Sequence, residues 1–277
     1  MSKTIFITGV SSGFGKDMAA EAARQGYTVI GTVRREEQLQ EVDKLSPGRT
    51  FGYLLDVNEH DNVASLLQSV IERFGRIDVL INNAGYGLMG AVEETSMVEA
   101  RMQMETNFFG ALAVTQAVLP YMRRSGSGHI VQFSSIAGLA SSPGLGLYNA
   151  SKFALEGMSE ALYLELKPLG IKLTIVEPGP FRTNWAGGSM KFTEAHISDY
   201  ADTAGKLQEY IKGINGSQPG DPVKGAQAVL EILKVENPPL RLLLGKSAID
   251  RAKAKIESIR TEIQHWEALG LSADFST

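Results

Sequence analysis

The chain has 277 residues, of which 43% are apolar and 21% charged, a composition typical of a globular protein large enough for one α/β domain. The formal charge of -4 is mild and no strongly basic face is evident, which argues against nucleic acid as the main partner. The sequence contains no cysteine, so disulfides, thiolate nucleophiles and cysteine-ligated metal sites are excluded.

The chain starts with Met1-Ser2-Lys3 and passes directly into an apolar run, without the long apolar region and cleavage site of a signal peptide. No run approaches the roughly 18 apolar residues of a membrane span. The four histidines show no metal-binding spacing. We therefore expect a cytoplasmic protein with no metal site and no membrane association.

Short apolar runs alternate with longer segments of helical period, which is the pattern of βαβ units in a parallel sheet. The runs are rich in Val, Ile, Leu and Phe, as expected for strands buried on both faces. The predicted strands are 5–8, 28–33, 50–55, 79–82, 130–133, 173–176 and 242–244. The predicted helices between them are 14–25, 36–45, 59–74, 98–124, 148–166 and 223–234. We predict an α/β fold with a single domain over residues 1–277, in which a Rossmann-like, doubly wound parallel sheet of about seven strands has helices on both faces.

Two segments depart from this alternation. Residues 184–218 carry Gly187-Gly188, several polar residues and the apolar anchors Met190 and Phe192, and we predict a substrate-binding lid there. A surface helical hairpin with no role in binding is the alternative. Residues 246–269 have charged and aliphatic side chains at helical spacing and are predicted to form a C-terminal helix.

Three glycines follow the first strand, at the point where a helix must begin. Gly9, Gly13 and Gly15 would allow a tight turn and let backbone N–H groups approach a pyrophosphate at the helix N-terminus. The spacing is G-x-x-x-G-x-G, which differs from the G-x-G-x-x-G dinucleotide fingerprint. A turn that only connects strand to helix is the alternative interpretation.

The end of the second strand indicates which dinucleotide is bound. An acidic residue there would accept hydrogen bonds from the adenosine ribose of NAD, but the sequence has Arg34-Arg35. Guanidinium groups suit the extra phosphate of NADP, so we predict NADP(H) as the favoured cofactor and NAD(H) as the alternative. Glu36 and Glu37 just downstream count against NADP(H), as would two arginines that are only solvated charges at a helix start.

Tyr148 and Lys152 are four residues apart in a predicted helix and therefore share one face. A nearby ammonium favours tyrosinate, so we expect Lys152 to lower the pKa of Tyr148 and make it a usable general acid or base. Thirteen residues upstream, Ser134-Ser135 closes a strand, and the run at 82–85 closes the preceding one. Both runs would lie at the carboxyl edge of the sheet, where open α/β sheets bind ligands.

With these motifs the chain resembles the short-chain dehydrogenase/reductase family over essentially its whole length. The resemblance combines T-G-x-x-x-G-x-G at 8–15, N-N-A-G at 82–85, a serine thirteen residues before Y-x-x-x-K, and P-G at 178–179, in the family's order and together with Asp56, Asn107 and Thr183. It implies a nicotinamide-dependent oxidoreductase that moves a hydride between the cofactor and a carbonyl or secondary alcohol.

The resemblance also implies the catalytic residues. Tyr148 would protonate the nascent alkoxide in reduction or deprotonate the alcohol in oxidation, and Ser135, rather than Ser134, would hydrogen-bond the substrate oxygen. Lys152 would hold the nicotinamide ribose, and Asn107 would keep a water chain from Lys152 to solvent.

For the cofactor, the resemblance implies that the glycine turn lines the phosphates, Arg34 binds the 2′-phosphate and Thr183 binds the carboxamide. The residues after the third strand would contact the adenine, and those at 83–85 would line the adenosine side of the cleft. The predicted cofactor residues are Gly9, Ser11, Ser12, Gly13, Phe14, Gly15, Arg34, Arg35, Asp56, Val57, Asn83, Ala84, Gly85, Tyr148, Lys152, Pro178, Gly179 and Thr183. NADP-preferring relatives often have a basic residue where this chain has Ser12, so the NADP prediction depends on the two arginines alone.

The residues expected around the substrate are mostly apolar, which favours a hydrophobic alcohol or ketone such as a steroid, retinoid or aromatic carbonyl. The predicted substrate residues are Tyr86, Leu145, Phe181 and Trp185, and those also expected near the cleft are Leu88, Met89, Ile136, Leu139, Met190 and Phe192. Ordinary packing of the core or the lid by several of these side chains is the alternative.

Two other functions share this fold. One is a catalytically silent protein that senses the NADP redox state, although such proteins can lose the tyrosine and lysine that this chain keeps. The other is epimerase or dehydratase chemistry on nucleotide sugars, although those relatives tend to have a larger C-terminal domain. The resemblance further implies a homodimer or homotetramer assembled through the helices 98–124 and 148–166.

Overall fold

Seven parallel strands form the central sheet of the computed structural model, which describes residues 2–275. The strands are β1 Thr4–Ile7, β2 Thr28–Val33, β3 Thr50–Leu54, β4 Val79–Asn82, β6 Gly128–Phe133, β7 Ile171–Pro178 and β9 Arg241–Leu244. Each lies within two residues of its predicted position. Their order is β3-β2-β1-β4-β6-β7-β9, so the direction of winding reverses between β1 and β4. Doubly wound sheets bind ligands above the carboxyl ends of the strands at such a reversal.

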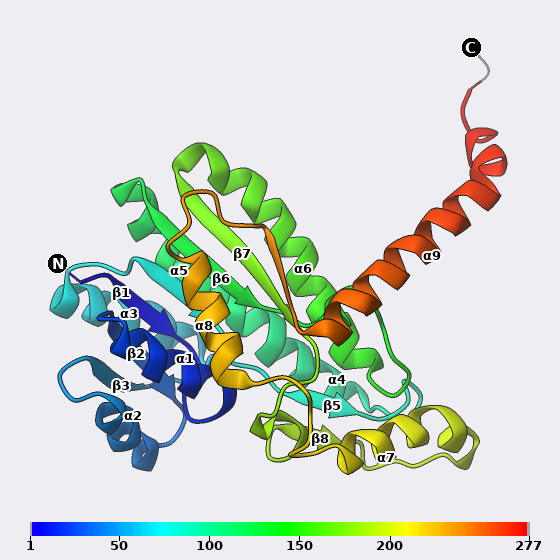
Figure 1. Ribbon diagram of the computed structural model, residues 1–277, viewed down its shortest axis with the longest axis horizontal. Coiled ribbons are helices and arrows are strands. Elements are labelled where there is room, and N and C mark those ends of the chain that lie inside the picture. The colour runs from blue at the N-terminus through cyan, green and yellow to red at the C-terminus, as the bar shows by residue number, and fades with distance from the viewer. Residues whose placement is uncertain (1, 276–277) are drawn as a thin grey trace.

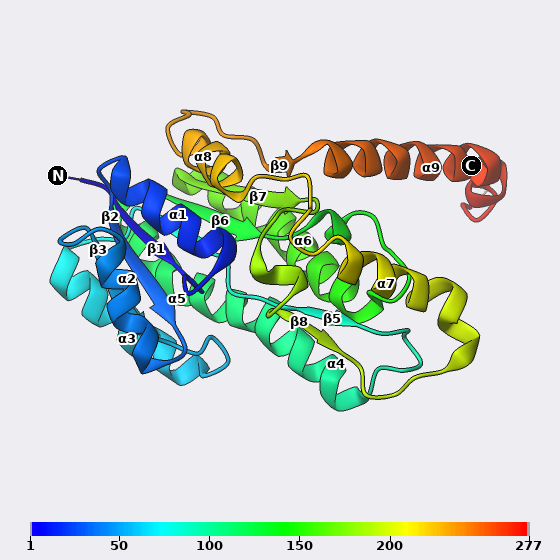
Figure 2. The same ribbon diagram turned by 60° about the horizontal axis from the view of Figure 1, so that its bottom comes forward.

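Helices cover both faces of the sheet, as the doubly wound prediction requires (Figure 2). On one face α1 and α8 pack side by side, with Met18 and Leu230 in a core shared with β1 and β2. On the other face α3, α5 and α6 enclose a second core that contains Leu67, Val118 and Leu162. The helices of these layers are α1 Gly13–Arg24, α2 Leu39–Leu45, α3 His60–Phe74, α5 Gly110–Ser125, α6 Gly146–Leu166 and α8 Pro222–Ile232.

The segment predicted as one helix over 98–124 is interrupted. It consists of α4 Met97–Met104, a π-helical turn at Glu105–Phe109, and α5. A π turn inserts an extra residue into the helical ladder, and such turns often mark functional positions. The buried Asn107 lies in this turn. Periodicity alone could not show the interruption, because the apolar pattern continues across it.

The predicted lid contains a strand that the sequence did not indicate. β8 Met190–Phe192 pairs in parallel with β5 Gly87–Met89 and forms a separate two-stranded sheet. Glu94 ties the segment to the body, since its buried carboxylate accepts a hydrogen bond from Ile197 N at 2.8 Å. The remaining elements are the 3₁₀ turns Asn184–Ala186 and Ser198–Tyr200, the π turn Ala201–Gly205 and α7 Lys206–Gly213.

The C-terminal helix α9, Lys246–Leu271, projects from the body of the molecule (Figure 1). Its first two turns pack on the 3₁₀ turn Ile136–Gly138 and the loop after it, with Ala248 and Ala252 buried. Arg251 Nη2 donates hydrogen bonds to Ala140 O at 2.6 Å and Ser142 Oγ at 2.9 Å. Every residue from 253 to 275 is exposed. None of the helices in the described part of the chain is long and apolar enough to cross a membrane.

Candidate active site

The turn between β1 and α1 has the geometry of an anion site. Gly9 and Gly13 have positive φ angles of 72° and 55°, which a side chain would strain. A Cβ at Gly15 would lie 2.2 Å from Gly9 O, so this position also excludes a side chain. The half-buried Ser12, at the N-cap of α1, makes no side-chain cap bond, and the first turn of α1 carries no acidic residue. The N–H groups that begin α1 are therefore available to an anion such as a pyrophosphate.

The segment after β4 holds this turn in shape. Thr8 Oγ1 accepts hydrogen bonds from Asn83 N and Ala84 N, both at 3.0 Å. Asn83 Nδ2 donates to Thr8 O at 3.0 Å and to Gly9 O at 2.9 Å. The side-chain donors of Asn83 are thus used within the protein, and Asn83 shapes the glycine turn.

Tyr148, Lys152, Asn107 and Ser135 come from three elements, α6, the π turn and the end of β6, and lie at the carboxyl edge of the sheet. Lys152 Nζ donates a hydrogen bond to Phe133 O at 2.8 Å and lies 5.9 Å from the centroid of the Tyr148 ring. Tyr148 and Lys152 are buried, with 5% and 6% of their surface exposed. A tyrosine and a lysine on one helix face are therefore brought together as predicted.

Asn107 links this group to the segment after β4. Its Oδ1 accepts a hydrogen bond from Tyr86 N at 3.0 Å, and its Nδ2 donates to Ser151 Oγ at 3.1 Å. A Cβ at the exposed Gly85 would lie 3.1 Å from Asn107 Oδ1 and 3.7 Å from Lys152 Nζ. Gly85 therefore leaves open space beside both polar groups, where the sugar of a dinucleotide would fit.

The expectation that Lys152 lowers the pKa of Tyr148 is wrong. Burial raises the pKa of Tyr148 to about 12, and the Ser135 side chain opposes that rise. Burial also lowers the pKa of Lys152 to about 8, against the attraction of Glu156. Desolvation dominates because both groups are enclosed, and the Lys152 ammonium is bound to the Phe133 carbonyl rather than to the phenol. The phenol of Tyr148 therefore stays protonated at neutral pH.

The two serines at the end of β6 have different surroundings. Ser135 is half-buried, and its Oγ accepts a hydrogen bond from Ala137 N at 3.1 Å, so its own hydroxyl proton can be donated to the Tyr148 oxygen or to a ligand. Ser134 is buried beside Glu156, since both side chains lie within 3.0 Å of where a Cβ of Gly138 would be. The surroundings of the two serines support the choice of Ser135 as the substrate-binding hydroxyl.

A partly buried ionic cluster lies behind Lys152 and was not predicted. Arg241 of β9 binds Glu156 at 2.5 Å, Glu160 at 2.5 Å and the fully buried Glu177. Burial raises the pKa values of Glu156 and Glu177, and the neighbouring Glu156 carboxylate adds to the rise of the Glu177 pKa, to about 7. The sequence held one signal, since Glu156 follows Lys152 by four residues on α6 and so lies on the same face.

The predicted 2′-phosphate residues differ in their surroundings. Both Arg34 and Arg35 are exposed at the end of β2, and Arg35 Nε lies 3.2 Å from Glu37 Oε1. No ion pair of Arg34 occurs within residues 2–275. Arg34 is thus the better placed of the two for a ligand phosphate, and Arg35 behaves as the solvated surface charge that the sequence left as an alternative.

The remaining predicted cofactor residues follow β3 and β7. Asp56 is half-buried, and its Oδ1 accepts a hydrogen bond from Asn58 N at 3.0 Å, while Val57 packs under Gly110. Thr183 Oγ1 accepts a hydrogen bond from Trp185 N at 3.3 Å, and the Thr183 side chain lies close enough to Gly13 to touch a Cβ there at 3.4 Å. The loop that follows Pro178-Gly179 therefore closes over the glycine turn.

Phe181 does not lie with the other predicted substrate residues. Its ring packs 4.9 Å from the ring of Phe14, and Phe14 packs 5.4 Å from Phe133. Glycines at 220, 225 and 245 leave the space that the Phe181 ring fills. The substrate role of Phe181 is therefore wrong, because the ring faces the core between α1 and α8. Phe14 likewise contributes its side chain to this core, so only its backbone can face a phosphate.

Apolar side chains surround Tyr148. Trp185 stacks on it with the ring centroids 5.4 Å apart, and Leu145, Met89 and Met190 complete the cluster. Gly87 permits this packing, since a Cβ there would lie 2.7 Å from the Trp185 ring. Leu88 is buried in β5 but does not belong to this cluster.

Four other residues expected near the cleft have different surroundings. Ile136 and Leu139 pack on the base of α9, which corrects the prediction that they lie near the cleft. Phe192 is partly exposed beneath Lys212, whose Nζ is 4.6 Å from the ring centroid. Tyr86 is half-buried, with Lys191 Nζ 4.8 Å from its ring centroid. The apolar wall next to Tyr148 is therefore smaller than the sequence suggested.

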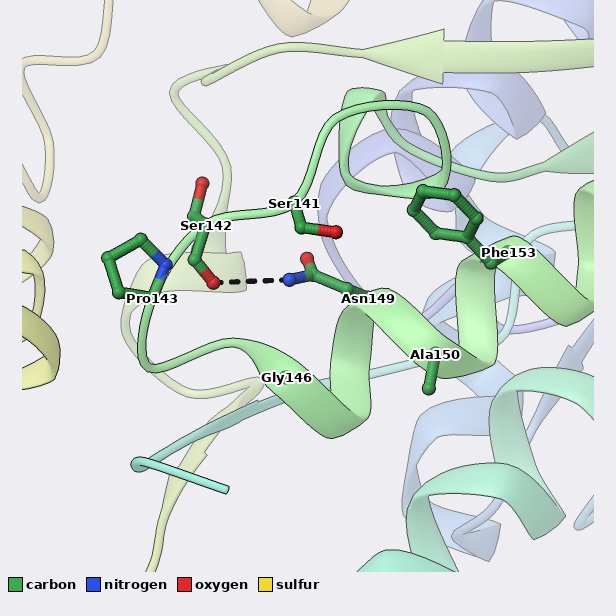
Figure 3. Close-up of a pocket in the computed structure, with 7 residues that line it drawn as sticks. All are labelled: Ser141, Ser142, Pro143, Gly146, Asn149, Ala150 and Phe153. Carbon is green, nitrogen blue, oxygen red and sulfur yellow. Dashed lines mark hydrogen bonds between the residues drawn. The ribbon is translucent and has the colours of Figure 1, made fainter. Parts of the chain in front are cut away.

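A shallow hollow of about 490 Å³ lies at the start of α6 (Figure 3). It is lined by Ser141, Ser142, Pro143, Gly146, Asn149, Ala150 and Phe153, and Asn149 Nδ2 donates to Ser142 O at 3.1 Å. None of the four candidate catalytic residues lines it. The hollow is therefore separate from the site around Tyr148. Within residues 2–275, no group of three His, Asp or Glu side chains lies close enough together to hold a metal ion.

Comparison with known proteins identifies the family. Residues 3–193 match the family model described as short chain dehydrogenase. The chain is 40% identical to oxidoreductase BOA17 of Botryotinia fuckeliana over 99% of this chain and 100% of the relative, and 40% identical to 3-ketodihydrosphingosine reductase of Bacteroides thetaiotaomicron over 87% of each. These relatives are named as oxidoreductases, which does not favour the sensor or epimerase alternatives.

Solved structures agree with the sequence comparison. A short-chain dehydrogenase from Streptomyces avermitilis superposes with a TM-score of 0.93, at 42% identity and with 99% of both chains covered. ElxO with NADP bound has a TM-score of 0.76 and 27% identity, covering 90% of this chain and all of that one. A Burkholderia phymatum short-chain dehydrogenase/reductase in complex with NAD has a TM-score of 0.83 and 25% identity, covering 94% and 95%. Sequence motifs, sheet topology and these relatives together show that the chain belongs to the short-chain dehydrogenase family and is an oxidoreductase.

Proposed function

We propose that the protein reduces a hydrophobic ketone or aldehyde to the alcohol with NADPH, with Tyr148 as the proton donor. The observation that carries this proposal is a protonated, buried phenol beside Lys152 and Asn107, at the carboxyl edge of a sheet whose glycine turn can bind a pyrophosphate. The nicotinamide dinucleotide supplies the hydride when bound.

The residues of this chain fit such a cofactor along its whole length. The uncapped N-terminus of α1 would bind the pyrophosphate, and the open space beside Gly85 would admit the ribose next to Lys152. Asp56 and Val57 would line the adenine, and Thr183 would bind the carboxamide. Arg34 favours NADP over NAD because an exposed guanidinium at the end of β2 can form bidentate bonds to a 2′-phosphate.

The raised pKa of Tyr148 favours reduction as the working direction. At neutral pH the phenol is protonated, which is the form that donates a proton to an oxygen as negative charge develops on it. The Ser135 hydroxyl, whose Oγ accepts from Ala137 N, can donate its proton to the same oxygen. Lys152, with its pKa near 8, would orient the ribose.

A bulky apolar substrate is supported by the side chains around Tyr148. Leu145, Trp185, Met89 and Met190 form an apolar wall, and apolar walls with a few polar groups are typical of hydrophobic ligand sites. The Bacteroides relative, 3-ketodihydrosphingosine reductase, is named for a ketone of an apolar chain, which agrees with this substrate class. Small polar ketones that turn over better than large apolar ones would contradict the proposal.

We infer in addition that the protein is a homo-oligomer through α4–α5 and α6. These helices expose the apolar side chains Val98, Met102, Phe109, Phe153 and Leu164. Contiguous exposed apolar residues often mark an interface between chains. Light scattering of the purified protein measures the number of subunits, and a monomer at all concentrations would contradict this inference.

A fluorescence titration with NADPH and NADH, followed through Trp185, tests the cofactor assignment. We expect NADPH to bind at least about tenfold more tightly, equivalent to about 1.4 kcal/mol. Arg34→Ala should remove most of this preference, whereas the matched Arg35→Ala should keep it, because Arg35 already pairs with Glu37. Equal losses in the two variants, or tighter binding of NADH by the wild type, would contradict the role of Arg34.

A further inference from the structure

The exposed part of α9 carries an apolar stripe that the fold does not use. Its members are Ile249, Ile256, Ile259, Ile263 and Trp266, which we call the α9 seam. Four of them have 42% to 65% of their surface exposed, although each is large and apolar. Both views show the helix extending away from the sheet and its covering helices (Figures 1 and 2).

The spacing of the seam is that of a two-stranded coiled coil. Successive members are separated by seven, three, four and three residues. Ala252 occupies the intervening position but packs with Ile136 and Ala140 of the same chain, so the part of the seam open to a partner runs from Ile256 to Trp266. A strict alternation of three and four places a narrow stripe along one face, which is the a and d pattern of a coiled coil. The stretch from Ile256 to Trp266 is about 15 Å long and gives four apolar layers in a two-fold pair.

The charges beside the seam decide the orientation of a partner. Lys253, Arg260 and Glu267 occupy the e positions, and Lys255 and Glu262 the g positions. In a parallel pair of identical helices, Lys255 would face Arg260 of the second copy, and Glu262 would face Glu267. Both contacts would be repulsive, so the sequence disfavours a parallel pair.

In an antiparallel pair the same residues are complementary. Arg260 faces Glu267 of the second copy, and Lys255 faces Glu262, each contact occurring twice by two-fold symmetry. The apolar layers then join Ile256 to Trp266 and Ile259 to Ile263. Arg260 lies one residue from the two-fold axis, and its guanidinium is also paired with Glu257 of the same helix at 2.6 Å.

We propose that the α9 seam binds the α9 seam of a second copy of this chain in an antiparallel, two-fold pair. At the e and g positions the basic residues lie in the inner half of the helix and the acidic residues in the outer half, so a reversed copy of the helix is complementary to it. An acidic outer half also disfavours an anionic membrane surface as the occupant. The pair is independent of the proposed function, because the seam contains none of the candidate catalytic residues.

Sedimentation and light scattering of the full chain test the pair directly. We expect the double variant Ile259→Glu/Ile263→Glu to have half the mass of the wild type at concentrations where the wild type is fully associated, with turnover unchanged. The matched control Ala254→Glu/Thr261→Glu changes the opposite, exposed face of α9 and should keep the wild-type mass. Equal masses for the wild type and the seam variant at every concentration would overturn the proposal.

Charge exchange tests the orientation. Lys255→Glu should weaken the association about tenfold in an antiparallel pair, because it then faces Glu262, and Lys255→Glu/Glu262→Lys should restore it. In a parallel pair Lys255→Glu would face Arg260 and strengthen the association instead. A strengthened association would overturn the antiparallel proposal.

The lack of cysteine in the chain allows a second test of orientation. Under oxidation, Arg260→Cys should cross-link to its own copy near the two-fold axis. Ile256→Cys should not, since its counterpart lies ten residues, about 15 Å, along the pair. The reverse result, or seam-dependent binding to phosphatidylglycerol vesicles without any change in mass, would overturn the proposal.

Discussion

The two long helices α6 and α9 use their apolar residues differently. α6 buries nine of its 21 residues, among them Tyr148, Lys152 and Leu155, between the sheet and the lid. α9 buries two of its 26 residues, both near its start, and exposes large aliphatic side chains along the rest. A helix that is buried along its length can hold chemistry in a fixed place, whereas an exposed apolar stripe needs a partner outside the fold.

The largest difference should appear in catalysis. Tyr148→Phe on α6 keeps the ring and removes the proton, so we expect turnover to fall by about 10²–10⁴-fold with cofactor binding retained. The exposed Trp266→Phe on α9 should leave turnover unchanged. Steady-state kinetics with a cofactor titration measures both, and turnover within tenfold of wild type for Tyr148→Phe would remove that residue from its assigned role.

Stability should follow burial in the same way. Leu155→Ala on α6 empties a site that is 1% exposed, so we expect the free energy of unfolding to fall by about 2–5 kcal/mol. Ile256→Ala on α9, 65% exposed, should cost less than about 0.5 kcal/mol at protein concentrations where the chains are dissociated. Denaturant unfolding of both variants checks this, and equal losses would break the contrast between the helices.

We expect the buried Lys152 of α6, which the proposed chemistry requires, to lower the stability of the folded protein. Its pKa is about 8 in the folded protein and near 10.5 when unfolded, so between these pH values the unfolded chain binds more protons and wild-type stability rises with pH. Below pH 8 Lys152 is charged in both states, so the full cost of burying its ammonium lowers the free energy of unfolding. Lys152→Met should therefore raise the free energy of unfolding by about 1–3 kcal/mol at pH 7, with the gain disappearing towards pH 10, and should abolish turnover. A gain that is constant with pH would contradict desolvation as its cause.

The smallest effect concerns the anchored base of α9. Arg251→Ala removes hydrogen bonds to Ala140 O and Ser142 Oγ, so we expect a loss of about 1–2 kcal/mol in the free energy of unfolding. The neighbouring exposed Lys253→Ala is the control and should change stability by less than about 0.5 kcal/mol when the chains are dissociated. No loss for Arg251→Ala would mean that α9 is as weakly attached at its base as at its tip.

The features of the fold and the site that the sequence predicted correctly are local ones. The strands, the glycine turn and the shared face of Tyr148 and Lys152 depend on residues close together in the chain, so their patterns could be read directly. The choice of Ser135 over Ser134 also followed from spacing, and the structure surrounds the two serines in a way that agrees with it.

What the sequence could not predict depends on distant contacts. The ring of Phe181 faces the core because glycines at 220, 225 and 245 leave space for it. The pKa of Tyr148 depends on how completely the lid and α6 enclose it, which spacing does not report. The contact between Glu156 and Arg241 joins residues 85 positions apart, and the β5–β8 sheet is too short to give a pattern.

The ion pairs and hydrogen bonds between the C-terminal part of the chain and the catalytic segment have a consequence for folding during synthesis on the ribosome. Ser135 and Tyr148 emerge early, but Arg241, which holds Glu156 and Glu177, and Arg251, which holds the loop between the serine and the tyrosine, emerge about a hundred residues later. At synthesis rates of about 5–20 residues per second, the catalytic segment lacks its contacts with Arg241 and Arg251 for several seconds. A nascent chain stalled before β9 should therefore show the early strands protected from protease and the segment around 135–148 still cleavable.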